Sequence, residues 1–187
     1  MTLEALAVIV VDTAERVGVE FMAVGASGDG ASGVPRSTKD VDLLVSLNVA
    51  GGVGALAEAL SPWVEFDRQV QFDTLTWGGR IVGRSRSVPP FKVELFEMFN
   101  DPFVQSEFSR RRSVFVPMLN RNTWLPTPED VIVQKLRWGR SKDLDDARDV
   151  LAVQGTESLD MAYIENWCAT HHTTDRFRAA LAGIPPL

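Results

Sequence analysis

The spacing of hydrophobic positions changes from helical to strand-like within the first 46 residues. An amphipathic helix is predicted first, because apolar residues recur three or four positions apart up to Val17 and Gly18 then offers a helix stop. The residues of this stripe are Leu3, Leu6, Ala7, Val10, Ala14 and Val17. Apolar runs at 20–24 and 40–46 predict two strands, and Pro35 prevents a continuous helix between them.

The middle of the chain is predicted to add one helix, a hairpin and another strand. Residues 53–60 carry the helical pattern, whereas residues 70–77 and 80–83 form strands joined by a two-residue turn at Gly78-Gly79. Residues 91–98 alternate imperfectly, with one face made of Phe91, Val93, Leu95 and Glu97 and the other of Lys92, Glu94, Phe96 and Met98. Both faces of this last strand are therefore expected to be partly covered.

The last third of the chain is helical in pattern. The segment Thr127-Pro128-Glu129-Asp130 is a helix start, with threonine as the N-cap, proline at the first helical position and acids in the first turn. Helices are predicted at residues 128–138, 142–154, 160–171 and 175–182. Since strands come early and helices late, we expect an α+β fold with a core at residues 1–124 and a helical subdomain at 125–187.

Composition favours a folded, soluble cytoplasmic protein. The 187 residues are 45% hydrophobic and 24% charged, which is ordinary for a globular domain. Cys168 is the only cysteine, so an internal disulfide is excluded. Acids within the first predicted helix, such as Glu4 and Asp12, argue against a signal peptide or a membrane span, and we expect no membrane partner.

The net charge of −6 at pH 7 opposes binding to nucleic acid through overall electrostatics. Three consecutive arginines at residues 110–112 are the one basic run, and we interpret them as a solvated surface cluster. Cys168 and His171 have a spacing that could hold a metal on a helix, but no second pair accompanies them, so we interpret them as structural.

Two aspartates on one predicted strand are the strongest candidates for chemistry. Asp40 and Asp42 stand two positions apart, so both side chains point to one face, where they repel unless a cation lies between them or one carboxylate is protonated. All-oxygen carboxylate sites suit Mg²⁺ or Mn²⁺. A third ligand is expected from a neighbouring strand: Glu94, an acid within an apolar run, is the preferred residue and Glu97 the competing one.

These residues resemble the polymerase-beta-like nucleotidyltransferase superfamily, particularly its small bacterial members and the AbiEii-like toxins. The resemblance covers about residues 21–45, through Gly25-Ala26-Ser27 and then Arg36-x-Thr38-x-Asp40-x-Asp42. It continues over about residues 128–151, through Lys135-Leu136 and Lys142-Asp143-Leu144-x-Asp146. The sequence departs from the superfamily pattern at Ala26, where many members carry Gly or Ser, and at the extra glycines Gly28 and Gly30.

The resemblance implies a nucleotidyltransferase fold, a small mixed sheet flanked by helices and followed by a C-terminal helical segment. It also implies a metal-dependent transfer of a nucleoside monophosphate from an NTP to a hydroxyl acceptor. Asp40 and Asp42 would hold the metal, and Glu94, assigned by its strand context, would complete the site and accept the proton of the hydroxyl. The residues expected to bind the nucleotide are Gly25, Ser27, Arg36, Lys135 and Asp143.

The acceptor is left open among RNA such as tRNA, a protein side chain and a small molecule such as an aminoglycoside. Because AbiEii-like toxins act in toxin–antitoxin and abortive-infection systems, the resemblance also predicts a toxin role and an antitoxin partner. The alternative is a catalytically silent binding or toxin–antitoxin partner protein with the same fold. A dinucleotide-binding unit is rejected although residues 28–33 match its glycine pattern, because Pro35 follows where a helix should begin.

Overall fold

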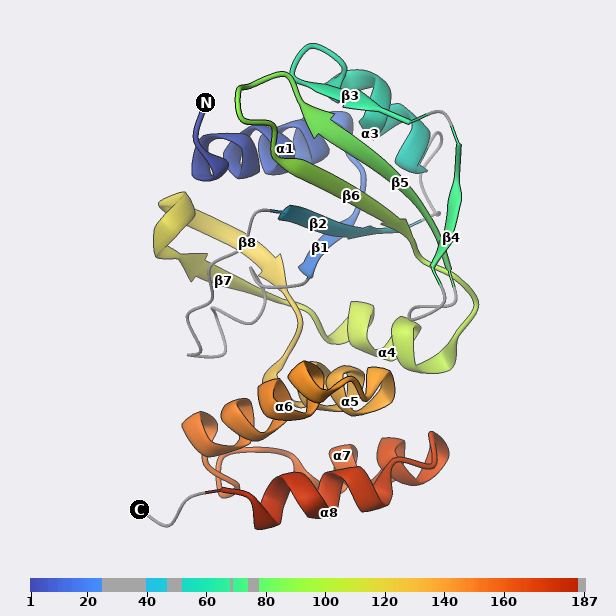
Figure 1. Ribbon diagram of the computed structural model, residues 1–187, viewed down its shortest axis with the longest axis vertical. Coiled ribbons are helices and arrows are strands. Elements are labelled where there is room, and N and C mark those ends of the chain that lie inside the picture. Colours follow the sequence, from blue (N-terminus) through green and yellow to red (C-terminus); the bar gives the residue numbers. More distant parts are fainter. Residues whose placement is uncertain (25–39, 47–51, 68, 74–77, 185–187) are drawn as a thin grey trace.

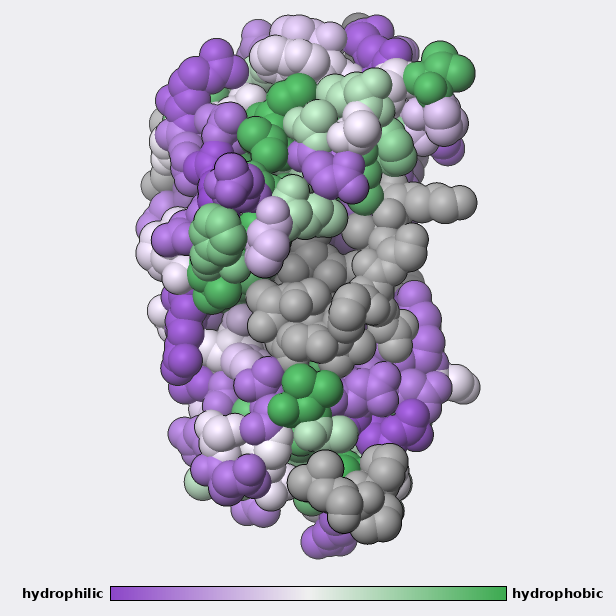
Figure 2. Space-filling view, turned by 90° about the vertical axis from the view of Figure 1, so that its left-hand side faces the viewer, coloured by the Kyte–Doolittle hydropathy of each residue, from purple (hydrophilic) through white to green (hydrophobic). Residues whose placement is uncertain are grey.

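The computed structural model describes residues 1–24, 40–46, 52–67, 69–73 and 78–184. Figure 1 shows two stacked halves, a sheet half that holds the N-terminus and a helical half at the C-terminal end. On the face drawn in Figure 2, hydrophilic residues cover much of the described surface, with smaller hydrophobic patches between them. Within the described ranges, no helix has both the length and the apolar character that a membrane span requires.

A mixed sheet forms the first half of the protein. Its strands follow the order β1-β2-β6-β5-β3, and β4 pairs with β5. The strands are β1 Phe21–Val24, β2 Asp40–Val45, β3 Val64–Phe66, β4 Gln71–Asp73, β5 Gly78–Ser85 and β6 Lys92–Glu97. Among these described strands β2 and β6 pair in parallel, and the other pairs are antiparallel. The predicted α+β architecture with a small mixed sheet is therefore confirmed.

Two of the described helices, α1 and α3, cover one face of this sheet (Figure 1). α1 Leu3–Val17 begins at Thr2, whose hydroxyl accepts a hydrogen bond from the Ala5 amide, and ends at Gly18, where a φ of 72° suits glycine. α3 spans Gly52–Leu60. The strand residues buried against the two helices include Val41, Leu43, Val93 and Leu95. Burying each such side chain contributes roughly 1.5–3 kcal/mol to the free energy of unfolding.

The opposite face of β2 and β6 is polar at one end and apolar at the other. Because strand side chains alternate, this face carries at its polar end Asp40, Asp42, Lys92 and Glu94. Further along the same face, Leu44 and Phe96 join a second core with the C-terminal helices. The polar residues therefore lie beside the junction between the two halves.

The hairpin predicted around residues 70–83 exists, but the prediction of a two-residue turn at Gly78-Gly79 is wrong. Both glycines lie inside β5 and pair with β4. Side chains crowd the two positions: a Cβ on Gly78 would lie 2.8 Å from Phe99 Cδ1, and one on Gly79 would lie 3.1 Å from Glu97 Oε2. The two glycines therefore permit close packing within a strand rather than a chain reversal.

The hydrophobic pattern does not predict three-residue β3 or the elements between the sheet and the C-terminal helices. The latter are α4 Pro102–Arg110, β7 Arg112–Val116, η1 Pro117–Leu119 and β8 Arg121–Leu125. α4 is capped by Asp101, whose carboxylate accepts hydrogen bonds from two amides of the first turn. β7 and β8 form an antiparallel ribbon in which Phe115 and Trp124 are exposed, so apolar side chains stand on its outer face and obscure the alternation.

Four helices follow in the C-terminal half (Figure 1). They are α5 Pro128–Trp138, α6 Ser141–Gln154, α7 Met161–Thr170 and α8 Thr174–Ala182, each within one residue of its predicted bounds. The predicted start of α5 is confirmed, since the Thr127 hydroxyl accepts a hydrogen bond from the Asp130 amide. Phe103 and Phe108 of α4 belong to the same core as these helices. A domain division between residues 124 and 125 stays a prediction.

Candidate functional site

Three carboxylates share one face of two neighbouring strands. Asp42 of β2 is the register partner of Glu94 of β6, and the strands run parallel, so both side chains point the same way. Asp40 lies two positions before Asp42 and therefore on that face too. The structure thus places the three acids that the sequence assigned to a metal site on one face of the sheet.

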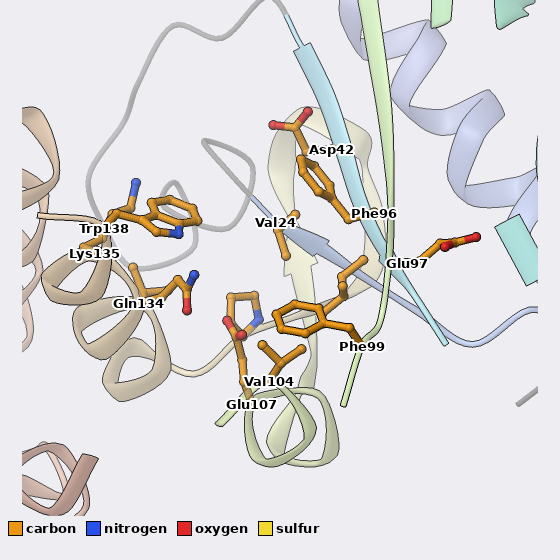
Figure 3. A pocket seen from close by; sticks show the side chains of 13 residues that line it. Val24, Asp42, Phe96, Glu97, Phe99, Val104, Glu107, Gln134, Lys135 and Trp138 are labelled. Carbon is orange, nitrogen blue, oxygen red and sulfur yellow. The ribbon is translucent and has the colours of Figure 1, made fainter. Parts of the chain in front are cut away.

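Glu97, the competing candidate for the third carboxylate, points elsewhere. Figure 3 shows its side chain directed away from Asp42, on the other side of the strands. Its carboxylate lies instead against β5, beside Gly79. Of the two glutamates that the sequence offered, Glu94 is the one that shares a face with Asp42.

Two cations that the sequence analysis did not assign hold Glu94. Arg80 Nη1 lies 2.8 Å from Glu94 Oε1, and Lys92 Nζ lies 2.6 Å from Glu94 Oε2. Lys92 Nζ is also 3.2 Å from Asp40 Oδ2, so it bridges two of the three acids. The alternation of β6 was a signal for Lys92, whereas Arg80 reaches Glu94 from β5 and could not be placed without knowing the strand pairing.

Asp42 has no comparable counter-ion among the described residues. Its Oδ1 atom is buried and accepts no hydrogen bond from any residue that the structure describes. Burial is the main cause that raises the pKa of Asp42 to about 7, and the negative charges of Glu94 and Asp40 add to it. Lys92 and Arg80 oppose this shift without cancelling it. A further cation beside Asp42 would relieve both the repulsion and the missing contact.

The chemistry of these side chains fits a divalent cation at the aspartate pair. Asp40 and Asp42 offer hard oxygen ligands, and the unpartnered Oδ1 of Asp42 is the kind of atom that a metal ion satisfies. Over the described ranges, no three His, Cys, Asp or Glu side chains are grouped so that they could hold a metal ion together. Glu94 has both of its oxygens in ion pairs, so it stands apart from the two aspartates in this respect.

Lys135 and Asp143, the site candidates from the C-terminal helices, have different surroundings. Lys135 is 7% exposed, its Nζ lies 2.8 Å from Asp146 Oδ2, and it lines the same cavity as Asp42. Asp143 is buried and pairs with Arg140 at the start of α6, where it caps the helix. The contacts of Asp143 are therefore those of a structural residue, whereas Lys135 combines an ion pair with Asp146 and a place in the lining of the cavity beside Asp42.

A cavity of about 110 Å³ lies between the polar face of the sheet and helices α4 and α5. Asp42 lines it from β2, and Gln134, Lys135 and Trp138 of α5 line it from the other side (Figure 3). Glu107 of α4 adds a buried carboxyl. The apolar part of the lining includes Val24, Leu44, Phe96, Phe99, Val104 and Val131. The acid cluster therefore adjoins a space that suits a small molecule.

Three nucleotide-binding candidates fall on a part of the chain about which the structure says nothing. Gly25, Ser27 and Arg36 all lie outside the described residues. Their assigned contacts with the nucleotide phosphates stay predictions that rest on the sequence resemblance.

The arginine run and the Cys/His pair have structural contacts. Arg110 lies 3.3 Å from the fully buried Asp130, so the interpretation of a solvated cluster is wrong for this residue. Cys168 is buried, and the His171 ring stacks on Trp167 with 5.4 Å between centroids. The structural interpretation of Cys168 and His171 agrees with these contacts.

Comparisons with known proteins identify the fold. No protein-family model matches the sequence, and no curated protein matches it. The chain is similar to the crystal structure of an antigenic nucleotidyltransferase-like protein from Paracoccidioides brasiliensis. The superposition includes 99% of this chain and 94% of that protein's chain, with a TM-score of 0.55 and 17% sequence identity. The solution structure of the antibiotic-resistance factor ANT(2″)-Ia covers 96% of both chains, with a TM-score of 0.60 and 14% identity.

A crystal structure of ANT(2″)-Ia in complex with adenylyl-2″-tobramycin is also similar. The superposition includes 92% of this chain and 98% of the ANT(2″)-Ia chain, with a TM-score of 0.63 and 12% sequence identity. Because the identities are low, the likeness establishes the fold: the chain has the nucleotidyltransferase fold over nearly its whole length. The closer resemblance to AbiEii-like toxins stays a prediction from the sequence.

Proposed function

We propose that this protein is a metal-dependent nucleotidyltransferase that moves a nucleoside monophosphate from an NTP to a hydroxyl acceptor. The observation that carries the proposal is the state of Asp42, which lies in register with Glu94 and two positions from Asp40. Among the described residues, its buried Oδ1 atom has no hydrogen-bond partner, and no cation forms an ion pair with its carboxylate. The nucleotidyltransferase fold supports the same chemistry. A solved neighbour in complex with adenylyl-2″-tobramycin supports a nucleotide substrate and a small acceptor in particular.

Asp40 and Asp42 are the residues that would hold Mg²⁺ or Mn²⁺. Such a metal ion supplies charge neutralisation at the phosphates and at the attacking oxygen. Glu94 would complete the site if the metal ion took the place of Lys92 in its ion pair. Lys92 Nζ bridges Asp40 and Glu94, so this position already favours positive charge. Competition between this ammonium and the divalent cation would then set the metal affinity.

The other side chains bind, orient or accept a proton. Glu94 is the proposed acceptor of the hydroxyl proton, and Arg80 orients its carboxylate through the 2.8 Å contact. Lys135 adds positive charge on the cavity side opposite Asp42. Asp143 supports the nucleotide site indirectly, since it caps the helix that carries Asp146, the partner of Lys135. The proposed phosphate contacts are Gly25, Ser27 and Arg36.

Two measurements together test the proposal. The first is the melting temperature with Mg²⁺ or Mn²⁺ and each of the four NTPs, since a ligand at about 100 times its Kd adds about 2.7 kcal/mol to the free energy of unfolding. The second is transfer of label from α-labelled NTPs to tRNA, to the protein itself and to small hydroxyl compounds. Stabilisation by metal with NTP, together with labelled product, is expected. Neither stabilisation nor transfer with any nucleotide would contradict the proposal.

A catalytically silent partner protein is the second candidate function. One observation favours it: Arg80 and Lys92 already occupy both oxygens of Glu94, as they would in a site that no longer needs metal. In that case the protein would act as a binding or toxin–antitoxin partner. Purification of a stable complex with an antitoxin-like protein, combined with no response to metal and NTP, would select this candidate.

A further inference from the structure

The cavity beside Asp42 combines apolar walls with polar atoms that have no partner. Gln134 Oε1, Trp138 Nε1 and Asp42 Oδ1 are buried, and no residue that the structure describes forms a hydrogen bond with any of them. All three residues line this cavity, from two different elements (Figure 3). Buried polar groups are normally satisfied, so three orphaned atoms around one space indicate that a ligand supplies their partners.

Glu107 adds a carboxyl to the same cavity. It is 6% exposed, and no described residue donates a hydrogen bond to it or forms an ion pair with it. Figure 3 shows its carboxyl directed upward into the space between Gln134 and Phe99. An unpaired carboxyl in such apolar surroundings is costly unless a donor or a positive charge reaches it.

The charges around Glu107 are already paired with one another. Arg137, the nearby cation, lies against Asp101, and its Nη2 is 2.5 Å from the Asp101 carboxylate. Asp130 receives hydrogen bonds from Tyr163 and from Arg110. Arg137 and Arg110 are therefore held by Asp101 and Asp130, and no cation among the described residues pairs with Glu107 itself. A positively charged donor on the ligand is the complement that this end of the cavity lacks.

The cavity also adjoins the proposed metal site. From Asp42 the lining continues along β2 to Leu44, away from Asp40. In nucleotidyl transfer the attacking oxygen has to lie close to the metal ion that neutralises the phosphate charge. A cavity that opens beside Asp42 is therefore where an attacking hydroxyl can bind.

The geometry points to a small amino alcohol with a largely apolar body as the acceptor, its ammonium group against Glu107 and Gln134 and its hydroxyl beside Asp42. This inference rests on the proposed nucleotidyl transfer and names its acceptor class. In the reaction the hydroxyl oxygen bonds to the α-phosphorus of the NTP and the bond to pyrophosphate breaks. Pyrophosphate leaves with the bonding electrons, and the hydroxyl proton passes to Glu94.

The experiment compares three matched probes on the full chain. They are 2-amino-1-phenylethanol, which has both groups; 1-phenyl-1-propanol, which replaces the amine by a methyl group; and 2-phenylethylamine, which lacks the hydroxyl. Kd is measured by calorimetry without nucleotide, for the wild type, for Glu107→Gln and for the control Glu65→Gln, whose side chain is 76% exposed on β3. We expect both amines to bind, the neutral alcohol to bind at least tenfold more weakly, and Glu107→Gln to remove most of this preference.

Two further readouts keep the outcomes distinct. Burial raises the pKa of Glu107 well above its ordinary value in the free protein, so amine binding should release a proton, seen as a dependence of the binding heat on the buffer. If Glu107→Gln folds poorly, Gln134→Leu is measured in the same way, with the same expected loss of amine affinity. Either variant leaving amine affinity unchanged would overturn the inference.

The acceptor assignment and the transfer function can fail separately. Amine binding through Glu107 without any label transfer would contradict the proposed nucleotidyl transfer but support the amine-binding site. Transfer to other hydroxyl compounds, with no amine binding, would keep the transfer function and overturn this inference. A tenfold loss of NTP affinity in Glu107→Gln with unchanged amine binding would show that the cavity holds the nucleobase, which also overturns it.

Discussion

Asp42 and Glu94 are register partners on two parallel strands, yet among the described residues only Glu94 has counter-ions within hydrogen-bond distance. The difference arises because Arg80 contacts one carboxylate oxygen of Glu94 and Lys92 contacts the other. Asp42 Oδ1, in contrast, is buried and has no partner among the described residues. The acid cluster is therefore asymmetric, with one neutralised carboxylate and one that gains from an added cation. This asymmetry leads to predictions that separate a metal site from a structural one.

Asp42→Asn should abolish nucleotidyl transfer and leave the metal-free fold intact. The amide keeps the size of the side chain but removes a metal-binding charge, and it relieves the repulsion from Asp40 and Glu94. Label transfer from α-labelled NTPs is expected to fall by at least a hundredfold, and the melting temperature without metal should not decrease. The control is Asp175→Asn, whose side chain is 99% exposed. A strongly destabilised Asp42→Asn, with no transfer in the parent protein, would show that Asp42 is structural.

Lys92→Met should make the protein less stable without metal and more responsive to it. The substitution removes the ammonium that Asp40 and Glu94 share, so their repulsion grows and a divalent cation no longer competes with Nζ. Titration with Mn²⁺, followed by the melting temperature, is expected to show roughly tenfold tighter binding than the wild type. Arg86→Met, which removes an exposed ion pair with Glu65 on edge strand β3, is the matched control. Weaker Mn²⁺ binding in Lys92→Met would mean that the lysine supports the site rather than competing with metal.

Glu107 should make the protein less stable as the pH rises. Burial, followed by the charge of Asp130, raises the pKa of Glu107 well above its ordinary value of 4.5; Asp101 adds to the shift, and Arg137 opposes it. An acid whose pKa is raised in the folded state contributes stability that is complete below pH 4.5 and is lost as the pH rises through the folded-state pKa.

Glu107→Gln removes this titration, so its advantage in melting temperature over the wild type should be larger at pH 8 than at pH 5. Thermal unfolding of both proteins across this range, in buffers of equal ionic strength, measures the difference. An advantage that is the same at both pH values would mean that Glu107 does not titrate in this window.

Lys135→Met should destabilise the protein, because Asp146 is 5% exposed and would lose the Nζ contact at 2.8 Å. The expected cost is roughly 3 kcal/mol in the free energy of unfolding, measured by denaturant titration. Adding Asp146→Asn should recover most of that loss. If Lys135 also contacts the nucleotide, the restored double variant should still lack the NTP-induced rise in melting temperature. A normal rise in the double variant would assign Lys135 to stability alone.

The local elements of this protein could be predicted from the sequence because their signals are local. Gly18 ends α1, and Thr127 with Pro128 starts α5, at the predicted positions. Capping and helical spacing act over three or four residues, so no knowledge of the fold is needed to recognise them. The same holds for Asp40 and Asp42, whose shared face follows from strand alternation alone.

Features that depend on distant contacts could not be predicted in this way. Gly78 and Gly79 have the composition of a turn, but the position of Phe99 and the pairing with β4 place them inside a strand. The pairing of β2 with β6, which joins Asp42 to Glu94 and admits Arg80 from β5, links segments far apart in the sequence.

The sequence by itself therefore determined α1, α3 and the four C-terminal helices, the strands near the site and the aspartate pair, since each depends on neighbours along the chain. Tertiary structure alone decided that Glu94 rather than Glu97 joins them, that Arg80 and Lys92 neutralise it, and that Glu107 faces a cavity shared with Asp42. The physical reason is that burial and counter-ion contact depend on which surfaces meet when the sheet packs on α4 and α5, and a one-dimensional pattern does not contain that information.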